Sequence, residues 1–231
     1  MLGELELLLR AVPGTASREH YRLAVIEDNA LLKPSSSTRA RTYSYLRDRF
    51  ALDPTVGIFA ALRLLWDRDV AGQPLMALLV AAFRDPVLRA TVPFVISVEP
   101  GRSVTSSEFG RTIAEAFPGR LGPKTLKSTG ENTTSTYKQS GHLQGRTHCI
   151  RQRVNPTPGS VTLALLLASL DDASGFSLLD SAWVHMLDGT PEQILSEARI
   201  ASGRGWLELR QAGDVLDITF HSLLSSIGWD S

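Results

Sequence analysis

The chain carries Trp206-Leu-Glu-Leu-Arg210 and, after a short break, Val215-Leu-Asp-Ile-Thr-Phe220, the two stretches that set its fold class. Apolar and polar side chains alternate in both, which is typical of a strand with one apolar face. The break, Gln211-Ala-Gly-Asp214, is a turn signal, so the pair predicts a β-hairpin. A lone hairpin is marginal in water and must pack on the helices before it. A helix followed by a hairpin is the layout of a winged helix.

Helical signals dominate the rest of the chain. Thr190-Pro-Glu-Gln193 is a capping box with proline at the first helical position, and it predicts the helix that precedes the hairpin. The apolar runs Pro74 to Phe83 and Val161 to Leu170 are each roughly half of a bilayer crossing, so we expect buried helices and no membrane partner. The fold class is mainly α: a helical bundle with winged-helix or helix-turn-helix-like elements and a C-terminal β-hairpin.

The length of 231 residues is enough for a full hydrophobic core and short for more than two domains. We expect an N-terminal helical domain with a helix-turn-helix-like element over residues 1–100. A C-terminal helical domain over residues 101–231 would carry a second basic segment and the hairpin wing. The β-branched stretch Pro93-Phe-Val-Ile-Ser-Val98 is compatible with a short strand or with a buried helix end.

The overall composition excludes several classes of protein. Apolar residues make up 43% and charged residues 21%, which is typical of a folded globular chain. Because 24 Lys and Arg balance 24 Asp and Glu, the net charge is zero and a uniformly basic coat is excluded. The single cysteine, Cys149, excludes an intrachain disulfide, and the first ten residues lack the basic start of a secretory signal. We therefore expect a cytoplasmic protein.

Cations are nevertheless concentrated in two short segments. Residues 33–49 hold five cationic side chains against one acid, Asp48, for a local charge of +4. Residues 120–153 hold seven against Glu131, for a local charge of +6. In a neutral chain this segregation favours a polyanionic partner over an ordinary solvated surface.

The first basic segment has the order of a helix-turn-helix motif. Ser17 can cap one helix, a short link follows, and the Ser-Ser-Ser-Thr cluster at residues 35–38 can cap a second helix that runs to Phe50. The second helix of such a motif enters the major groove of DNA. The candidate DNA-binding residues are Ser37, Thr38, Arg39, Arg41, Tyr45 and Arg49. The alternative is an ordinary solvated helix face.

The second basic segment repeats this pattern of hydroxyls followed by cations. Thr133-Thr-Ser-Thr-Tyr-Lys-Gln139 resembles Ser35-Ser-Ser-Thr-Arg-Ala-Arg41, with Asn132 as the expected cap and residues 122–127 as a short helix before the turn. The candidate DNA-binding residues here are Lys124, Lys127, Thr133, Thr136, Lys138, Gln139, Arg146, Arg151 and Arg153. A mobile polar loop is the alternative.

Catalytic and metal-binding patterns are weak. Cys149 lies beside His148 and seven residues after His142, but neighbours in sequence rarely face each other and no nucleophile elbow surrounds the cysteine. No second cysteine or acidic ligand completes a tetrahedral metal site nearby. We expect no catalytic residue, no metal and no cofactor, and therefore no enzyme.

The first fifty residues contain Glu27-Asp-Asn-Ala-Leu-Leu-Lys33, the Ser-Ser-Ser-Thr-Arg cluster that ends at Arg39, and Tyr45-Leu-Arg-Asp-Arg-Phe50. These three short motifs resemble the N-terminal part of the BrxA family of BREX (bacteriophage exclusion) loci. Residues 132–143 are similar to the family's second Ser/Thr-Lys stretch. The resemblance implies a non-enzymatic helical protein that binds double-stranded DNA beside other BREX proteins in phage defence.

Two other functions stay open at this point. A winged-helix transcription regulator would bind a specific operator, whereas a protein–protein scaffold would use its basic segments to meet acidic partners.

Overall fold

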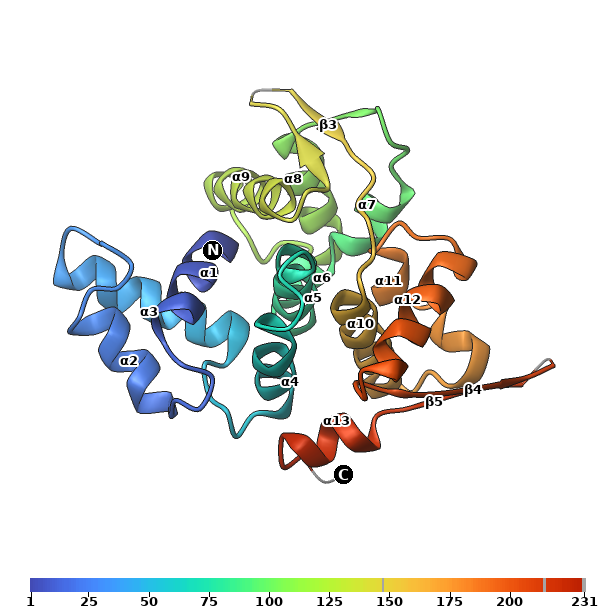
Figure 1. Cartoon of the computed structure of the whole chain (residues 1–231). Helices are drawn as coiled ribbons and strands as arrows, with labels where there is room; N and C mark the ends of the chain where they lie inside the picture. The colour runs from blue at the N-terminus through green and yellow to red at the C-terminus, as the bar shows by residue number, and fades with distance from the viewer. Residues whose placement is uncertain (147, 214, 230–231) are drawn as a thin grey trace.

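The computed structural model describes residues 1–146, 148–213 and 215–229. Its elements are, in chain order, α1 (Leu2–Ala11), α2 (Arg18–Ile26), α3 (Ser36–Phe50), α4 (Gly57–Trp66), α5 (Gln73–Arg84), α6 (Pro86–Arg89), α7 (Val92–Ser97), β1 (Ser103–Val104), α8 (Ser106–Ala116), α9 (Pro123–Gln139), β2 (Leu143–Gln144), β3 (Cys149–Arg151), α10 (Pro158–Leu170), the 3-10 helix η1 (Gly175–Leu178), α11 (Ala182–His185), α12 (Pro191–Gly203), β4 (Glu208–Ala212), β5 (Val215–Thr219) and α13 (His221–Ser226). The fold is mainly helical, as the sequence predicts (Figure 1).

The centre of the molecule is built from the two apolar runs. α5 is buried from Leu75 to Ala82, and α10 is buried from Gly159 to Ala168. A helix that is apolar on every side must be surrounded by other elements, and α5 contacts α1, α3, α4 and α10. The prediction of two buried helices is confirmed.

The predicted hairpin is present and packs on the helix before it. β4 and β5 pair antiparallel, with Arg210 opposite Asp217, and Leu216 and Ile218 are buried. β4 contacts α12 and β5 contacts η1, far from α2 and α3 (Figure 1). The wing therefore accompanies α12 and not the N-terminal helix pair. Asp214, the last residue of the expected turn, lies outside the described residues.

The N-terminal helix pair forms at the predicted positions. Ser17 caps α2, and the Ser35 side chain caps α3 by accepting a hydrogen bond from the Thr38 amide at 3.2 Å. The link is longer than the tight turn that we expected, because it covers residues 27–35, whereas a helix-turn-helix uses about three or four. Asn29 holds this link by bonding to both the amide and the carbonyl of Lys33, at 2.7 and 3.1 Å.

The predicted turn inside the second basic segment is wrong, because residues 123–139 form one continuous helix, α9. Gly130 lies at the place where we expected the turn. It is buried against α8, where an added Cβ would come 2.3 Å from the Ser106 carbonyl oxygen. This glycine lets two helix backbones approach closely; it does not break the helix.

A small antiparallel sheet with strand order β1-β3-β2 covers one end of α9. Ile150 pairs with Ser103, and Arg151 pairs with Leu143. The preceding β-branched stretch is a helix, α7, so the helix alternative for residues 93–98 is the correct one. β3 thereby brings Arg151 beneath α7.

Buried apolar side chains from both halves of the chain form one continuous cluster. α10 from the second half packs on α4 and α5 from the first. The domain boundary at residue 100 stays a prediction. Within the described ranges, every helix is too short or too polar to cross a bilayer.

Candidate nucleic-acid interface

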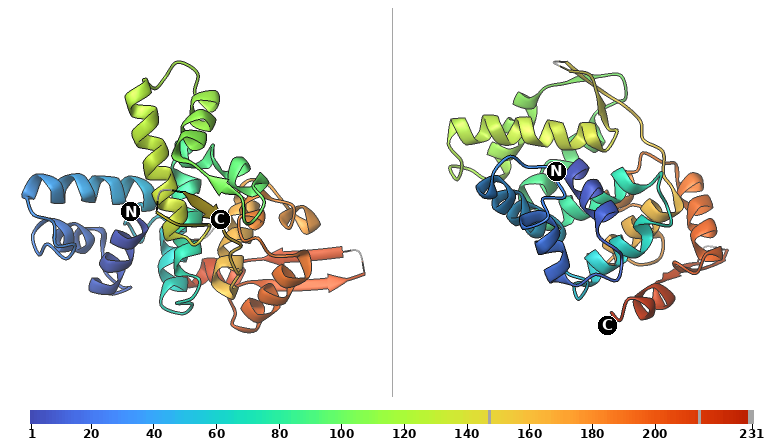
Figure 2. Two further views of the ribbon diagram at one scale, coloured as in Figure 1. Left: turned by 90° about the horizontal axis from the view of Figure 1, so that it is seen from above. Right: turned by 60° about the vertical axis from the view of Figure 1, so that its left-hand side comes forward.

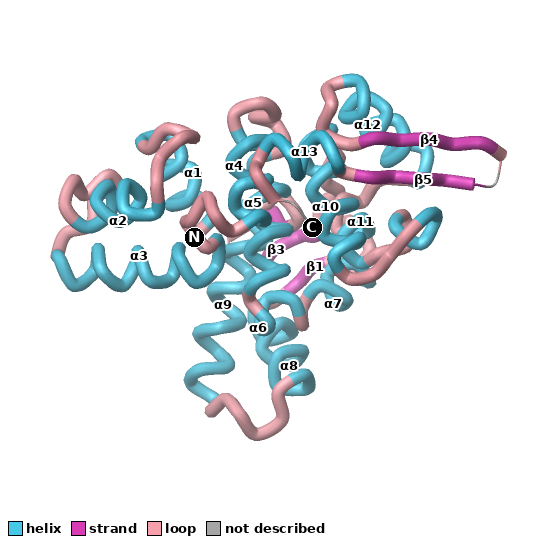
Figure 3. Tube along the Cα trace, turned by 90° about the horizontal axis from the view of Figure 1, so that it is seen from below, coloured by secondary structure: helices cyan, strands magenta, loops and turns pink. Residues whose placement is uncertain are grey.

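The structure brings the two basic segments together at one corner. The C-terminal halves of α3 and α9 meet beside α1, and their N-terminal ends diverge into solvent (Figures 2 and 3). A polar cleft of about 370 Å³ lies in this corner. It is lined by Met1, Glu4, Tyr45, Arg49, Asn132, Ser135, Thr136 and Gln139. We call it the corner cleft.

The outer face of α3 presents most of its predicted residues to solvent. Ser37 and Arg41 are exposed, Thr38 is half-buried, and the Tyr45 side chain is 54% exposed. These positions share one face because they are three or four residues apart. In the described part of the chain, Arg41 takes part in no ion pair or side-chain hydrogen bond. Its charge is therefore free for a partner.

Two other arginines of α3 are less available. Arg49 pairs with Asp85, at the junction of α5 and α6, with 3.2 Å between Nε and the carboxylate. Arg39 is half-buried, and its Nε is enclosed without a hydrogen-bond partner among the described residues. Arg49 is therefore engaged by an acid of the protein, and Arg39 is partly enclosed by the fold.

α9 divides its predicted residues between two sides. Lys124, Lys127 and Lys138 are exposed, and none of them forms an ion pair with a described residue. Thr133 and Thr136 are only 5% and 7% exposed, so the prediction that both hydroxyls project toward phosphate or bases is wrong. Thr136 lines the corner cleft, but its hydroxyl donates to the Asn132 carbonyl at 3.1 Å. The packing of α9 on α8 and α1 buries residues that the hydroxyl pattern alone places in solvent.

Gln139 serves the fold and is not free for DNA. Its Oε1 accepts hydrogen bonds from the Gly3 amide at 3.0 Å and from the Met1 amine at 3.4 Å. Its Nε2 donates to the carbonyl and the hydroxyl of Ser135, at 3.1 and 3.0 Å. The side chain therefore fastens the end of α9 to the start of α1, which corrects its predicted role.

Arg151 is the clearest correction, since its side chain is only 1% exposed. Nη2 and Nη1 donate to the two carboxylate oxygens of Asp188 at 2.6 and 2.9 Å, and Nε donates to the Val95 carbonyl at 3.2 Å. Nη1 also bonds the Gln152 carbonyl. A buried bidentate pair holds β3, α7 and the segment after α11 together, so Arg151 cannot contact DNA.

The remaining predicted arginines, Arg146 and Arg153, lie on the surface on either side of β3. Arg146 and Arg153 are exposed, and neither pairs with an acid among the residues that the structure describes. They stay candidates for phosphate contact at the edge of the small sheet.

The cysteine and histidines weighed as a catalytic or metal site do not converge. Cys149 is buried. His142 is fully buried, with Nε2 donating to the Met186 carbonyl at 2.8 Å and Nδ1 accepting from the Ser140 hydroxyl at 2.9 Å. Burial, together with the nearby Arg151 charge, lowers the pKa of His142 to about 4, so the ring is neutral at pH 7. In the described ranges no three His, Cys, Asp or Glu side chains are grouped to hold a metal ion.

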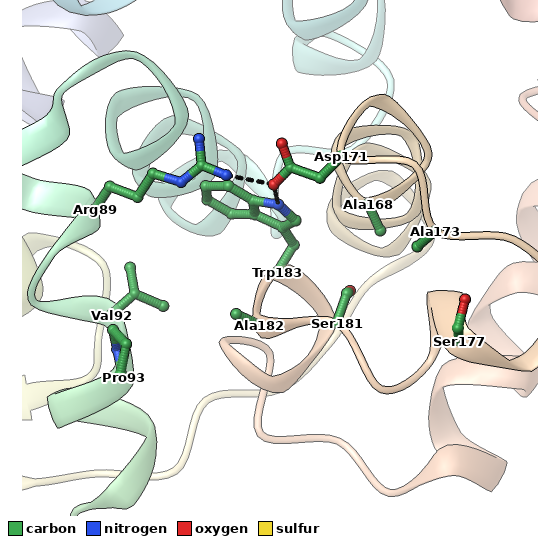
Figure 4. Close-up of a pocket in the computed structure, with 10 residues that line it drawn as sticks. All are labelled: Arg89, Val92, Pro93, Ala168, Asp171, Ala173, Ser177, Ser181, Ala182 and Trp183. Atoms are coloured by element: carbon green, nitrogen blue, oxygen red, sulfur yellow. Dashed lines mark hydrogen bonds and ion pairs between the residues drawn. The ribbon is translucent and has the colours of Figure 1, made fainter.

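A second pocket, of about 350 Å³, was not foreseen from the sequence (Figure 4). Asp171, at the end of α10, accepts a hydrogen bond from Trp183 Nε1 at 2.9 Å and pairs with Arg89. The Arg89 guanidinium lies 5.0 Å from the centre of the Trp183 ring. The other lining side chains are small or apolar: Val92, Pro93, Ala168, Ala173, Ser177, Ser181 and Ala182.

No family model, curated protein or solved structure matches this chain. The resemblance to BrxA accordingly rests on its short motifs. In the structure the first of these, residues 27–33, forms the link between α2 and α3 that Asn29 holds, and the other two lie at the start and the end of α3.

Proposed function

We propose that this protein binds double-stranded DNA through the outer faces of α3 and α9, without catalysing a reaction. The observation that carries the proposal is the position of three cations, Arg41, Lys124 and Lys138. All three are exposed and are free of ion pairs with described residues. They are carried by α3 and α9, the two helices whose C-terminal halves meet beside α1 (Figure 2), although these helices come from segments far apart in the sequence.

Phosphate contacts account for this kind of binding better than base contacts. Cations on two diverging helices can follow a charged backbone, and each neutralised phosphate releases counterions. At the α3 N-terminus the Thr38 amide is capped by Ser35, but the amides of Ser36 and Ser37 bond no described residue and suit phosphate oxygens as well. Binding should therefore depend steeply on salt and only weakly on sequence.

The positions of His142 and Cys149, the side chains that we considered for catalysis, also agree with a binding role. Both ring nitrogens of His142 are hydrogen-bonded, one to the Ser140 hydroxyl and one to the Met186 carbonyl, and Cys149 is buried. By its resemblance to BrxA, we propose that DNA binding serves a BREX-type phage-defence system in which other BREX proteins are partners.

Fluorescence anisotropy with a labelled duplex over a salt series tests the proposal. Replacing Arg41, Lys124 and Lys138 together by Ala should reduce the slope of log affinity against log salt by about three and weaken binding about 100-fold near 0.1 M salt. The matched control removes three exposed arginines elsewhere, Arg10, Arg68 and Arg210. Equal binding by the two variants would contradict the proposal. A tight, sequence-dependent footprint would instead favour a transcription regulator.

The pocket beside Trp183 favours a protein–protein scaffold as a second candidate function. Its lining is mainly apolar, and the exposed side chain of Phe176 lies next to its Ser177 wall. Ala182→Trp would fill the pocket. If scaffolding is the function, this variant should lose co-purifying defence proteins, and the unmodified protein should not be retained on heparin.

A further inference from the structure

Tyr45 is an aromatic platform without a stacking partner of its own. Its side chain is 54% exposed at the edge of the corner cleft, one helical turn from Arg41. Phe109 and Tyr137, by contrast, stack on each other in the core with ring centroids 5.3 Å apart. Among described residues the Tyr45 ring stacks with no other ring and no cation. An exposed ring on a basic surface is the usual platform for a nucleobase.

The wall opposite Tyr45 offers unused hydrogen-bonding groups. The Asn132 side-chain amide is exposed and bonds no described residue, although its backbone carbonyl accepts from the Thr136 hydroxyl. An amide presents a donor and an acceptor side by side, which matches the edge of a base. Ser135 accepts from Gln139 and keeps its own proton for donation. Together they can bond the edge of a planar group in the cleft.

The interior of the cleft is charged, but each of its cations already contacts a carboxylate. Glu4 contacts Lys33 Nζ at 3.3 Å and the Met1 amine at 3.0 Å, while Arg49 faces Asp85. Burial raises the pKa of Glu4, but hydrogen bonds and charge from the amine and from Lys33 outweigh it and hold that pKa below its ordinary value. Because these cations are engaged within the protein, the cleft offers a neutral base stacking and hydrogen bonds without a free cation that would select a phosphate.

We propose that the corner cleft receives one unpaired nucleobase, stacked on Tyr45 and bonded by Asn132, while Arg41 and Lys138 hold the adjoining phosphates outside. The volume of about 370 Å³ lies within the range of about 300–1,000 Å³ found for ligand sites. The protein should then prefer DNA with an unpaired segment over fully paired DNA. This inference rests on the proposed DNA binding, because it names the form of DNA that the same surface takes.

The test compares a short duplex with the same duplex carrying a central mismatched bubble, so that both have the same number of phosphates. The unmodified protein should bind the bubble about ten-fold more tightly, as stacking of one base on an aromatic ring allows. Tyr45→Phe keeps the ring and should keep the preference. Tyr45→Ala should bind both DNAs equally while retaining the salt dependence. Asn132→Ala should reduce the preference in part.

Phe176→Ala is the matched control, because Phe176 is a 42% exposed aromatic side chain on η1, an element that contacts β5 and α10. It should leave the preference unchanged. A 2-aminopurine in the bubble should lose fluorescence on binding the unmodified protein and Tyr45→Phe, but not Tyr45→Ala. Circular dichroism confirms that each variant is folded.

Two outcomes separate this inference from the proposed function. Equal affinity for duplex and bubble, with a steep salt dependence, overturns the base site and leaves DNA binding standing. Absence of salt-dependent binding to either DNA overturns both. A bubble preference that persists in Tyr45→Ala overturns the assignment of the stacking residue.

Discussion

Gly130 of α9 lies directly against Ser106 of α8, so close that a Cβ on Gly130 would come 2.3 Å from the Ser106 carbonyl oxygen and 3.1 Å from the Gly110 amide nitrogen. The two helices cross where one of them has no side chain. This crossing holds α9 in place beside α3, and it determines where Lys124, Lys127 and Lys138 project.

Gly130→Ala should therefore lower the free energy of unfolding by about 1–3 kcal/mol, because two backbones would have to separate to admit one methyl group. The gain in helix propensity, about 1 kcal/mol, works against this loss. Urea denaturation measures the change. Gly203→Ala is the control, since no atom lies within 4 Å of its added Cβ. Similar stability of the two variants would contradict the close helix crossing.

Arg151→Met should destabilise the protein by about 3–5 kcal/mol, because it leaves the carboxylate of Asp188 without the partner that neutralises it. Thermal and urea unfolding report the loss. Arg153→Met, two residues later on the exposed side, should change stability by no more than about 0.5 kcal/mol. If both variants unfold alike, Arg151 is not the structural residue described above.

Stability should fall with acid because of His142. Its pKa is lowered to about 4 in the folded protein, whereas an unfolded histidine titrates at its ordinary value of 6.5. Between these two pKa values the histidine is protonated in the unfolded state and neutral in the folded state. The resulting stability is fully present above pH 6.5 and is lost as the pH falls toward 4, by about 3 kcal/mol in total.

Urea titrations at pH 7 and at pH 4.5 measure this loss in the unmodified protein and in His142→Gln. The variant should be less stable at pH 7 and show a smaller difference between the two pH values. His148→Gln, at an exposed position, should retain the full pH dependence. An equal pH dependence in both variants would show that other groups cause it.

Local chemistry in the sequence predicts much of this fold. Ser35 caps α3, and Thr190 forms a capping box with Gln193, because a side-chain oxygen bonds an amide only three residues away. The apolar runs that become α5 and α10, and the alternation that becomes β4 and β5, are likewise patterns within one element. Such signals depend on neighbours along the chain, so they can be read without knowing the rest of the molecule.

The roles of Gly130 and Arg151 could not be predicted in this way. A glycine in a polar segment is typical of a turn, so the sequence around Gly130 predicts one. Only the position of Ser106 in the folded protein shows that Gly130 is the point where two helices cross. Arg151 has the charge of a phosphate-binding residue, and its pairing with Asp188 places it in the interior. In each case the deciding partner lies more than twenty residues away, and no local propensity carries information about it.

The corner cleft likewise combines residues that the sequence identifies with an arrangement that only the tertiary packing determines. The cations and hydroxyls of residues 33–49 and 120–153 are visible in the sequence, and so is their segregation from the acids. That Tyr45 and Asn132 line one cavity, while Thr133 turns inward, depends on how α9 packs between α8 and α1. Composition and periodicity specify which side chains each helix offers, whereas the burial of apolar surface between helices selects the ones that remain in solvent.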